Sequence, residues 1–417
     1  MLQIKTNKGI NAVIEAPPSK SYTNRALIIA SLAKGKSIIR NPLISDDTNY
    51  MISALNEFGI GIKKKGSDLI VDGTGGNLKT PKKQLYAGNA GTTMRFITSL
   101  SALCEHDSMI SGDKRMQERP IKDLLDALEM LGVRSKSNNG FPPVKIFGGT
   151  FKGGKIKLRG STSSQYLSSI LMCAPYAKDD TIIELSDNLT SKPYVDVTID
   201  IMKNFGVKIV NKNYKKLIIK TNRQYKPKDY RIEGDASNAS YFLAAAAITK
   251  GKVNVKGLNP KSKQGDIKFI EILRKMGCKI KTGRDFVEIV GGRLKGIDAD
   301  MNSMPDLVPT VAVMALFADG ETKIRNVQNL RVKETDRLRA LAFELRKIGA
   351  NVEETADGLK IRKRRYQKAV IETYGDHRIA MSFAVAGLVI SGIRIINPSC
   401  VNKSFPEFWK KFGELYN

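Results

Sequence analysis

The sequence predicts an α/β protein built from a repeated unit, because two phrases recur together six times along its 417 residues. One is an amphipathic, helix-like phrase that ends in an apolar residue and a glycine, as in SALNEFG and IEILRKMG. The other is a helix-like phrase rich in alanine, serine and leucine, followed by a polar break and a β-branched strand, as in FLAAAAITKGKVNVKG. Two phrases that share one period indicate a duplicated unit of helices and strands.

The glycines of the first phrase mark where its helices should end. Glycine adopts the left-handed conformation after a helix without a Cβ penalty. A β-branched stretch, polar residues and a second apolar stretch follow the first five glycines, which predicts a strand pair after each helix. The glycines are Gly59, Gly132, Gly206, Gly277, Gly349 and Gly413, at intervals of 73, 74, 71, 72 and 64 residues.

The second phrase has the same period of about 72 residues and places one strand in each unit. Its small residues favour close packing in the interior, whereas the glycine-ended helices carry charge on one face. The strand positions are Ile39, Ile110, Ile183, Val255, Ile324 and Ile395, at intervals of 71, 73, 72, 69 and 71 residues.

Two arrangements of six units remain open, a solenoid and a pair of globes with three units each. The pair suits the size limits of single domains better. The polar stretch Thr221–Asp235 is the expected boundary, and the first residues, with the strand-like NAVIEA, are available to complete the short sixth unit. We therefore expect one globe of residues 1–18 plus 235–417, with residues 19–234 inserted as the other.

Composition and charge narrow the function classes. Hydrophobic residues make up 41% and charged residues 26%, as in ordinary globular proteins. Lys+Arg exceed Asp+Glu by 69 − 41 = 28, which favours anionic partners such as nucleic acid, an acidic surface or small phosphorylated substrates. A lysine-rich bias that only maintains solubility is the alternative.

The cysteines and the N-terminus predict a cytoplasmic protein without a metal site. The four cysteines are far apart and form no CxxC pair, and there are only two histidines. The first residues lack the apolar core of a signal peptide, and no apolar run approaches the roughly 18–20 residues that span a bilayer.

Polar loops precede the small-residue helices. Pro17–Arg25 contains hydroxyls, a lysine and an arginine, the ingredients of an anion site at a helix N-terminus. Gly88–Arg95 offers two glycines for close backbone approach but does not match the nucleotide-binding P-loop. Ser161–Gln165 is again rich in hydroxyls. Each loop alone is explained by helix capping; three at equivalent positions favour anion binding.

Further charged loops carry candidate residues. Asp113–Pro120 and Arg331–Arg337 read, in isolation, as a solvated turn and a salt-bridged helix face. Gly375–Arg378 precedes the sixth small-residue helix, and Asp306 precedes the fifth. The pattern of polar loops before these helices therefore continues through the chain.

Eight segments taken together resemble the EPSP synthase family, from about Pro17 to Phe408. They are SKSYTNRAL, GNAGTTMRF, RMQERP, STSSQY, SKPYVDVT, RVKETDRL, GDHRIAM and NKSFPEF. The resemblance implies two inside-out α/β globes, each of three repeats with parallel helices inside, and an active site between them. It also implies transfer of the enolpyruvyl group of phosphoenolpyruvate to the 5-hydroxyl of shikimate 3-phosphate, through a tetrahedral ketal, with no metal or cofactor.

The same resemblance implies residue roles. Catalysis falls to Lys20, to Asp306 as base on the 5-hydroxyl, and to Glu334 for proton transfer at the methylene carbon. Shikimate 3-phosphate is expected to contact Lys20, Ser21, Arg25, Ser163, Ser164, Gln165, Ser191, Tyr194, Asp306, Asn329 and Lys333. Phosphoenolpyruvate is expected to contact Lys20, Asn89, Gly91, Thr92, Arg119, Gln165, Arg337, Arg378 and Lys403.

One residue departs from the family pattern, and two rivals are weighed. Phe96 stands where many bacterial and plant members have a proline that supports the glycine loop, which bears on sensitivity to glyphosate, the family's phosphoenolpyruvate-competitive inhibitor. The sibling enolpyruvyltransferase acting on UDP-N-acetylglucosamine usually has a reactive cysteine in the loop Asp113–Pro120, and none occurs here. A nucleic-acid binder would fit the charge, but no such motif is present. We expect a monomer with no nucleic-acid or membrane partner.

Overall fold

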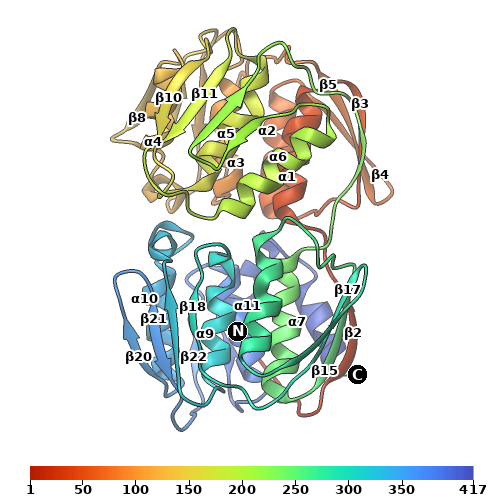
Figure 1. The fold of residues 1–417 in the computed structure, drawn as a ribbon, viewed down its shortest axis with the longest axis vertical. Helices are drawn as coiled ribbons and strands as arrows, with labels where there is room; N and C mark the ends of the chain where they lie inside the picture. The colour runs from red at the N-terminus through yellow and green to blue at the C-terminus, as the bar shows by residue number, and fades with distance from the viewer. Residues whose placement is uncertain (417) are drawn as a thin grey trace. The chain divides into compact units, whose positions relative to one another are not determined.

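The computed structural model describes residues 1–416, and its contacts divide the chain into two units. Unit 1 consists of Met1–Pro17 and Glu233–Asn417, and unit 2 consists of Pro18–Ile232. The chain thus begins in unit 1, builds unit 2 and returns to unit 1. Each unit contains three small sheets and a set of helices (Figure 1).

Unit 2 repeats one arrangement of two helices and a four-stranded sheet three times. Its helices are α1 (Lys20–Leu32), α2 (Asp46–Glu57), α3 (Gly91–Ser101), α4 (Lys122–Met130), α5 (Ser164–Cys173) and α6 (Lys192–Asn204). The first sheet has the order β14 (Asp229–Arg231), β3 (Lys34–Arg40), β5 (Asp68–Thr74), β4 (Gly61–Lys65). The second is β6 (Leu85–Tyr86), β7 (Ser108–Ser111), β9 (Phe141–Ile146), β8 (Ser135–Asn138), and the third is β10 (Gly154–Leu158), β11 (Thr181–Leu185), β13 (Lys216–Ile219), β12 (Val210–Lys212).

Unit 1 has the same plan with a shorter third sheet. Its helices are α7 (Ala236–Thr249), α8 (Phe269–Lys275), α9 (Val308–Ala315), α10 (Arg337–Lys347), α11 (His377–Gly387) and α12 (Phe408–Gly413). Its four-stranded sheets are β16 (Lys279–Thr282), β17 (Phe286–Val290), β15 (Lys252–Lys256), β2 (Asn11–Glu15) and β18 (Asp298–Asp300), β19 (Glu321–Arg325), β21 (Leu359–Arg362), β20 (Asn351–Glu354). The third is β1 (Leu2–Gln3), β23 (Arg394–Ile395), β22 (Val370–Ile371).

The strand residues that defined the repeat occupy equivalent positions in all six sheets. Each lies in a central strand and pairs in parallel with an edge strand. The pairs are Ile39 with Tyr230, Ile110 with Leu85, Ile183 with Ile156, Val255 with Ile14, Ile324 with Ala299 and Ile395 with Ile371. The sixfold α/β repeat predicted from the spacing is therefore confirmed.

The ends of the repeat differ from the expectation in two details. Five of the six glycines are left-handed just after a helix, with φ between 82° at Gly59 and 103° at Gly277, but Gly413 is the last residue of α12 and is not. After Gly413 the chain continues into the short 3-10 turn Glu414–Tyr416 and not into a strand, so the left-handed conformation that ends the other five helices is not required here. Leu2–Gln3 completes the sixth sheet, whereas the NAVIEA stretch joins the fourth unit beside β15.

Each unit has helices inside and sheets outside. Every residue of α9 and of α11 is buried, and these helices contact α7 and one another (Figure 1). In unit 2, α3 contacts both α1 and α5, and most residues of these three helices are buried. Small side chains, as in the run Ala244–Ala247 of α7, allow this close approach. The strands alternate between buried and exposed residues, as in β15.

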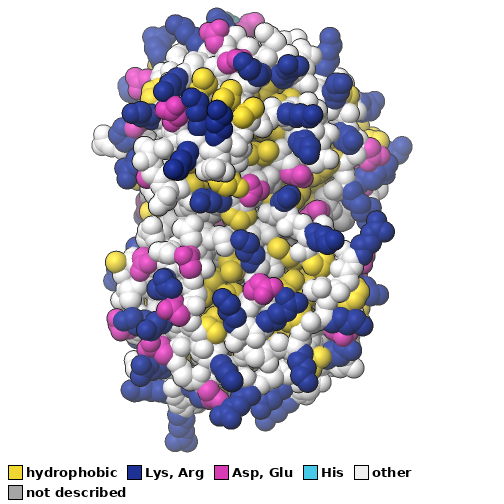
Figure 2. All heavy atoms as spheres, in the orientation of Figure 1, with side chains coloured by type: hydrophobic (Ala, Val, Ile, Leu, Met, Phe, Trp, Pro, Cys, Tyr) yellow, Lys and Arg dark blue, Asp and Glu magenta, His cyan; other side chains and the backbone are white. Residues whose placement is uncertain are grey.

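Two features concern the partners expected from the sequence, the distribution of surface charge and the length of the helices. Figure 2 shows Lys and Arg side chains scattered over the displayed face, with Asp and Glu among them. In the described chain, no helix has the length and apolarity to span a membrane.

Candidate active site

The predicted site residues fall into two clusters, one in each unit. Unit 2 holds Lys20, Ser21, Arg25, Asn89, Gly91, Thr92, Arg119, Ser163, Ser164, Gln165, Ser191 and Tyr194. Unit 1 holds Asp306, Asn329, Lys333, Glu334, Arg337, Arg378 and Lys403. Many lie at or just before the first turn of a helix, where free backbone N–H groups and the helix dipole favour anions.

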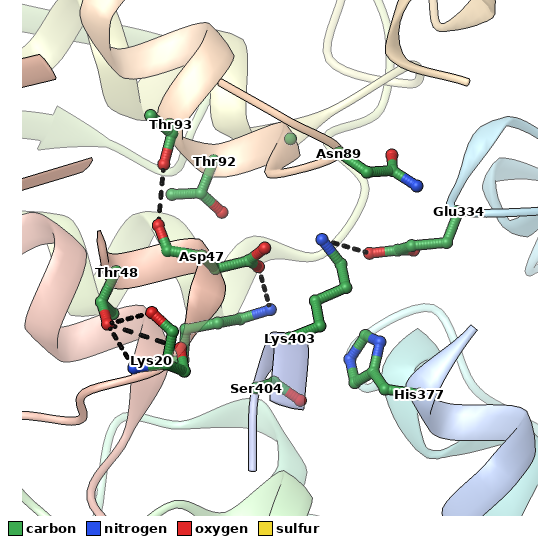
Figure 3. Close-up of polar contacts among 12 residues, drawn as sticks. Lys20, Asp47, Thr48, Asn89, Thr92, Thr93, Glu334, His377, Lys403 and Ser404 are labelled. Atoms are coloured by element: carbon green, nitrogen blue, oxygen red, sulfur yellow. Dashed lines mark hydrogen bonds and ion pairs between the residues drawn. The ribbon is translucent and has the colours of Figure 1, made fainter. Parts of the chain in front are cut away.

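Lys20, the first residue of α1, is paired with an acid that sequence reasoning missed. Its Nζ lies 2.8 Å from Oδ2 of Asp47, whose side chain is only 3% exposed (Figure 3). Asp47 lies in the first turn of α2, which Ser45 and Thr48 cap reciprocally. Its backbone carbonyl accepts a hydrogen bond of 3.2 Å from Thr93 of α3. The Ser45–Thr48 capping pattern was the available sequence signal.

Arg25 is a buried cation surrounded by neutral groups. Its Nε donates to Thr198 Oγ1 at 2.7 Å, and its Nη1 donates to the Ser21 carbonyl at 3.1 Å. No ion pair within residues 1–416 involves it, and burial lowers its pKa to about 10. Its guanidinium therefore remains a cation at neutral pH.

The glycine loop and Arg119 form the next part of the unit 2 cluster. Arg119 Nη1 donates to both the backbone carbonyl and Oδ1 of Asn89, at 3.1 and 3.0 Å. A Cβ on Gly91 would lie 2.5 Å from Arg119 Nη2, so only glycine fits at this position without displacing the guanidinium. Gln165 Nε2 donates to Thr92 Oγ1 at 3.2 Å, which links this loop to α5.

Hydroxyl groups complete the unit 2 cluster. Ser163 caps α5 by accepting from the Gln165 backbone N–H at 3.2 Å, and Ser164 is buried beside it. Ser191, the residue before α6, is buried with a left-handed φ of 54°. The Tyr194 ring lies 5.9 Å from the Arg25 guanidinium carbon.

Arg337, the first residue of α10, is the centre of the unit 1 cluster. Its side chain is 1% exposed and donates to three carboxylates: Nε to Asp376 at 2.7 Å, Nη1 to Asp306 at 3.1 Å and Nη2 to Glu334 at 2.8 Å. Burial opposes the charge, but these three carboxylates outweigh it and raise the pKa of Arg337 above its ordinary value.

Asp306 is an acid of the cluster whose pKa is strongly lowered. It accepts from Arg378 Nη2 at 2.7 Å as well as from Arg337. Burial alone would raise its pKa, but Arg378, Lys333 and Arg337 together hold it well below the usual range. Asp306 is therefore fully ionised at neutral pH.

The remaining unit 1 residues surround this centre. Lys403 Nζ lies 3.9 Å from Glu334 Oε1 (Figure 3), and Asn329 is buried in the 3-10 turn Gln328–Val332. Asp376, which sequence reasoning left without a role, caps α11 by accepting from the Arg378 N–H at 2.9 Å. Since Asp376 also binds Arg337, it connects two of the predicted phosphoenolpyruvate ligands.

A second buried acid was also missed. Asp266 accepts from the Ser237 hydroxyl at the start of α7, and burial raises its pKa to about 7, with Asp306 contributing.

In the described residues no group of three or more His, Cys, Asp or Glu side chains could hold a metal ion.

The comparisons with known proteins decide the family. The family model described as EPSP synthase (3-phosphoshikimate 1-carboxyvinyltransferase) matches residues 4–412. The chain belongs to the EPSP synthase family. A relative from Hamiltonella defensa named 3-phosphoshikimate 1-carboxyvinyltransferase is 47% identical over 415 residues, which covers 97% of this chain and 96% of the relative. One of the same name from Actinobacillus pleuropneumoniae is 47% identical over 420 residues, with the same two coverages.

Solved structures agree with this family assignment. An EPSP synthase from Acinetobacter baumannii superimposes with a TM-score of 0.82 at 27% identity, over 99% of this chain and 97% of that one. The predictions of the fold class, the family and a 3-phosphoshikimate 1-carboxyvinyltransferase of the shikimate pathway are confirmed.

Proposed function

We propose that the two cationic clusters bind phosphoenolpyruvate and shikimate 3-phosphate for enolpyruvyl transfer. The observation that carries the proposal is the presence of four buried arginines among the predicted ligands, Arg25 and Arg119 in unit 2 and Arg337 and Arg378 in unit 1. The two substrates together bring two phosphates and two carboxylates. Arginine suits such oxyanions because its planar donors match their geometry.

Shikimate 3-phosphate is the ligand of the hydroxyl-rich part of unit 2. The buried Ser164 and Ser191 lie near helix starts, where hydroxyls and backbone N–H groups suit a phosphate. The full proposed set is Lys20, Ser21, Arg25, Ser163, Ser164, Gln165, Ser191, Tyr194, Asp306, Asn329 and Lys333.

Phosphoenolpyruvate is the ligand of the glycine loop and of the arginines of unit 1. Gly91 leaves the backbone and Arg119 open to close approach by an anion. The full proposed set is Lys20, Asn89, Gly91, Thr92, Arg119, Gln165, Arg337, Arg378 and Lys403.

The reaction follows as addition and then elimination. Once Arg337 binds the substrate anion in place of Glu334, the Glu334 carboxylate takes up a proton from water and becomes the acid. The 5-hydroxyl oxygen then bonds to C2 of phosphoenolpyruvate while Asp306 takes the hydroxyl proton and the protonated Glu334 delivers its proton to the methylene carbon, which gives the tetrahedral ketal. The C2–O bond to phosphate then breaks, Glu334 takes a proton back from the new methyl group, the double bond re-forms, and phosphate leaves with the proton that Asp306 accepted. Lys20 offsets the charge that develops on the phosphate oxygens.

The ion pairs of Asp306 make its basicity depend on the substrate. While Arg378 and Arg337 donate to it, Asp306 is a weak base because its pKa is held low. When these arginines bind the anionic groups of phosphoenolpyruvate instead, the pKa of Asp306 rises towards its ordinary value. The acceptor hydroxyl is therefore deprotonated efficiently only with both substrates present.

We further propose how the chain as a whole works. Each of the two units acts as one domain, and both contribute ligands to the two substrates. The enzyme acts as a monomer in the cytoplasm, where the free thiols Cys104, Cys173 and Cys278 stay reduced. The reaction uses general acid and base groups and needs no metal or cofactor.

The deciding experiment is phosphate release from phosphoenolpyruvate with shikimate 3-phosphate or UDP-N-acetylglucosamine as acceptor. We expect turnover with shikimate 3-phosphate only. Equal or greater turnover with UDP-N-acetylglucosamine would contradict the proposal. A steeply salt-dependent affinity for nucleic acid without phosphate release would favour a nucleic-acid binder instead.

A further inference from the structure

The buried guanidinium of Arg25 is held by four helices of unit 2. Arg25 projects from α1, and its Nη2 lies 3.4 Å from the Ser168 hydroxyl of α5. From α6, Thr198 Oγ1 accepts from Arg25 Nε at 2.7 Å and lies 2.9 Å from the Tyr194 carbonyl. The contact from α3 is aromatic.

That contact is made by Phe96. The Arg25 guanidinium carbon lies 5.2 Å from the centre of the Phe96 ring, and both side chains are buried. Tyr194 presents a second ring at 5.9 Å. An aromatic face attracts a cation through its quadrupole, most strongly when water is excluded.

Aromatic faces hold a cation differently from a carboxylate. A carboxylate beside Arg25 would neutralise it and compete with an incoming anion, as Asp306 does for Arg378. Rings orient the guanidinium and leave its full charge in place. Hydroxyls such as those of Thr198 and Ser168 likewise satisfy N–H groups without adding negative charge.

We propose that Phe96 is a positioning residue for shikimate 3-phosphate, because its ring face holds the Arg25 guanidinium ready for the anionic ligand. The inference rests on the proposed function, which makes Arg25 a ligand of that substrate. Phe96 acts through Arg25 and not through the glycine loop, although Gly91 and Thr92 occupy the first turn of the same helix. It should therefore affect the affinity for shikimate 3-phosphate and leave that for phosphoenolpyruvate nearly unchanged.

The test weakens the ring face while keeping its shape. Phe96 is replaced by 4-fluoro-, 3,5-difluoro- and 3,4,5-trifluorophenylalanine, and the Kd for shikimate 3-phosphate is measured by calorimetry without phosphoenolpyruvate. We expect log Kd to rise with each fluorine, reaching about 5- to 30-fold weaker binding for the trifluoro ring. kcat and the KM for phosphoenolpyruvate should change less than about twofold, since removing uniform binding of one substrate leaves them in place.

Two controls separate this effect from packing. Phe58, a fully buried phenylalanine of unit 2 just after α2, receives the same fluorinated series and should leave the Kd unchanged. Phe96→Leu keeps an apolar side chain without a ring face and should weaken shikimate 3-phosphate binding like the trifluoro ring does.

The outcomes assign any failure to its cause. A flat Phe96 series, in an enzyme whose unmodified form binds shikimate 3-phosphate, would overturn the inference alone. A rise in the KM for phosphoenolpyruvate with an unchanged Kd for shikimate 3-phosphate would also overturn it and make Phe96 a support of the glycine loop. Failure of the unmodified enzyme to bind shikimate 3-phosphate would contradict the proposed function and the inference with it.

Discussion

Asp306→Asn removes one negative charge from beside two buried arginines and should destabilise unit 1. The carboxylate accepts from Arg378 Nη2 at 2.7 Å and from Arg337 Nη1 at 3.1 Å. The two arginine side chains are 6% and 1% exposed, so water cannot replace the lost partner easily. Asparagine keeps the size of the side chain and one neutral acceptor, so the change tests charge and not volume.

The expected cost is about 2–4 kcal/mol in the free energy of unfolding. A hydrogen bond to a charged group contributes about 1.5–3 kcal/mol, and two are weakened here. The amide oxygen still accepts one of them, and Arg337 keeps Asp376 and Glu334 as partners, so the cost stays below the sum of both. Loss of the base should also lower kcat by about 10²- to 10⁴-fold.

The cost should depend on pH in a defined direction. The pKa of Asp306 is lower in the folded protein than the unfolded value of about 3.9, so its stabilisation is fully present above about pH 5. It is lost as the pH falls through the folded-state pKa. The difference between wild type and Asp306→Asn should therefore be constant from about pH 5 to 8 and shrink in more acidic solution.

Urea unfolding followed by tryptophan fluorescence measures this loss of stability. The fluorescence reports on unit 1, because the only tryptophan of the chain, Trp409, lies in α12 of that unit. The matched control is Asp298→Asn, which removes an exposed carboxylate 2.6 Å from Arg325 in the same unit. An exposed pair contributes about 0–1 kcal/mol. Two results would contradict the proposed role of the Asp306 charge. One is a loss of unfolding free energy in Asp306→Asn no greater than that in Asp298→Asn, and the other is a loss that grows as the pH falls.

Three further predictions test the clusters separately. Lys20→Met should lower kcat/KM at least about 100-fold with an unchanged circular dichroism spectrum; a folded variant with most of its activity would show that this loop only caps α1. Gly91→Ala places a Cβ 2.5 Å from Arg119 Nη2, so the KM for phosphoenolpyruvate should rise about 10- to 100-fold while the Kd for shikimate 3-phosphate stays constant, and an unchanged KM would refute this. Shikimate 3-phosphate with glyphosate or an intermediate analogue supplies anions that bind cations of both units, and we predict that this draws the units together and reduces the radius of gyration in solution scattering, less so at high salt. An unchanged radius at proven saturation would contradict this predicted closure.

The repeat was readable from the sequence because burial imposes it. Positions such as Ile110 and Ile324 must be β-branched or apolar where a central strand faces the helices, so the period survives although the loops differ. The pairing of the edge strands was harder to predict from the sequence, because the partners are far apart in the chain. β14 pairs with β3 from about 190 residues away, and β2 pairs with β15 across the whole of unit 2. No local pattern specifies a partner that distant.

The site shows the same division between local and remote information. Cations and hydroxyls before a helix are local features, so Lys20, Ser163 and Arg378 could be proposed from the sequence. The acids that pair with such cations could not be proposed in this way, because they are distant in the sequence. Asp376 is 39 positions from Arg337, and Asp47 is 27 positions from Lys20. The carboxylate that pairs with a buried cation is determined by tertiary packing.

The two clusters differ in how their cations are balanced, and this difference bears on the order of events. Arg25 and Arg119 form no ion pair within residues 1–416, so an anion that binds either of these arginines displaces only neutral groups. An anion that binds Arg337 must compete with Asp306 and Glu334. We therefore expect the phosphate of shikimate 3-phosphate to bind tightly by itself and phosphoenolpyruvate to bind weakly until the acceptor hydroxyl offers Asp306 a new hydrogen bond. The same competition weakens phosphoenolpyruvate binding and, once this substrate occupies Arg337, releases Asp306 to act as the base and Glu334 to act as the acid.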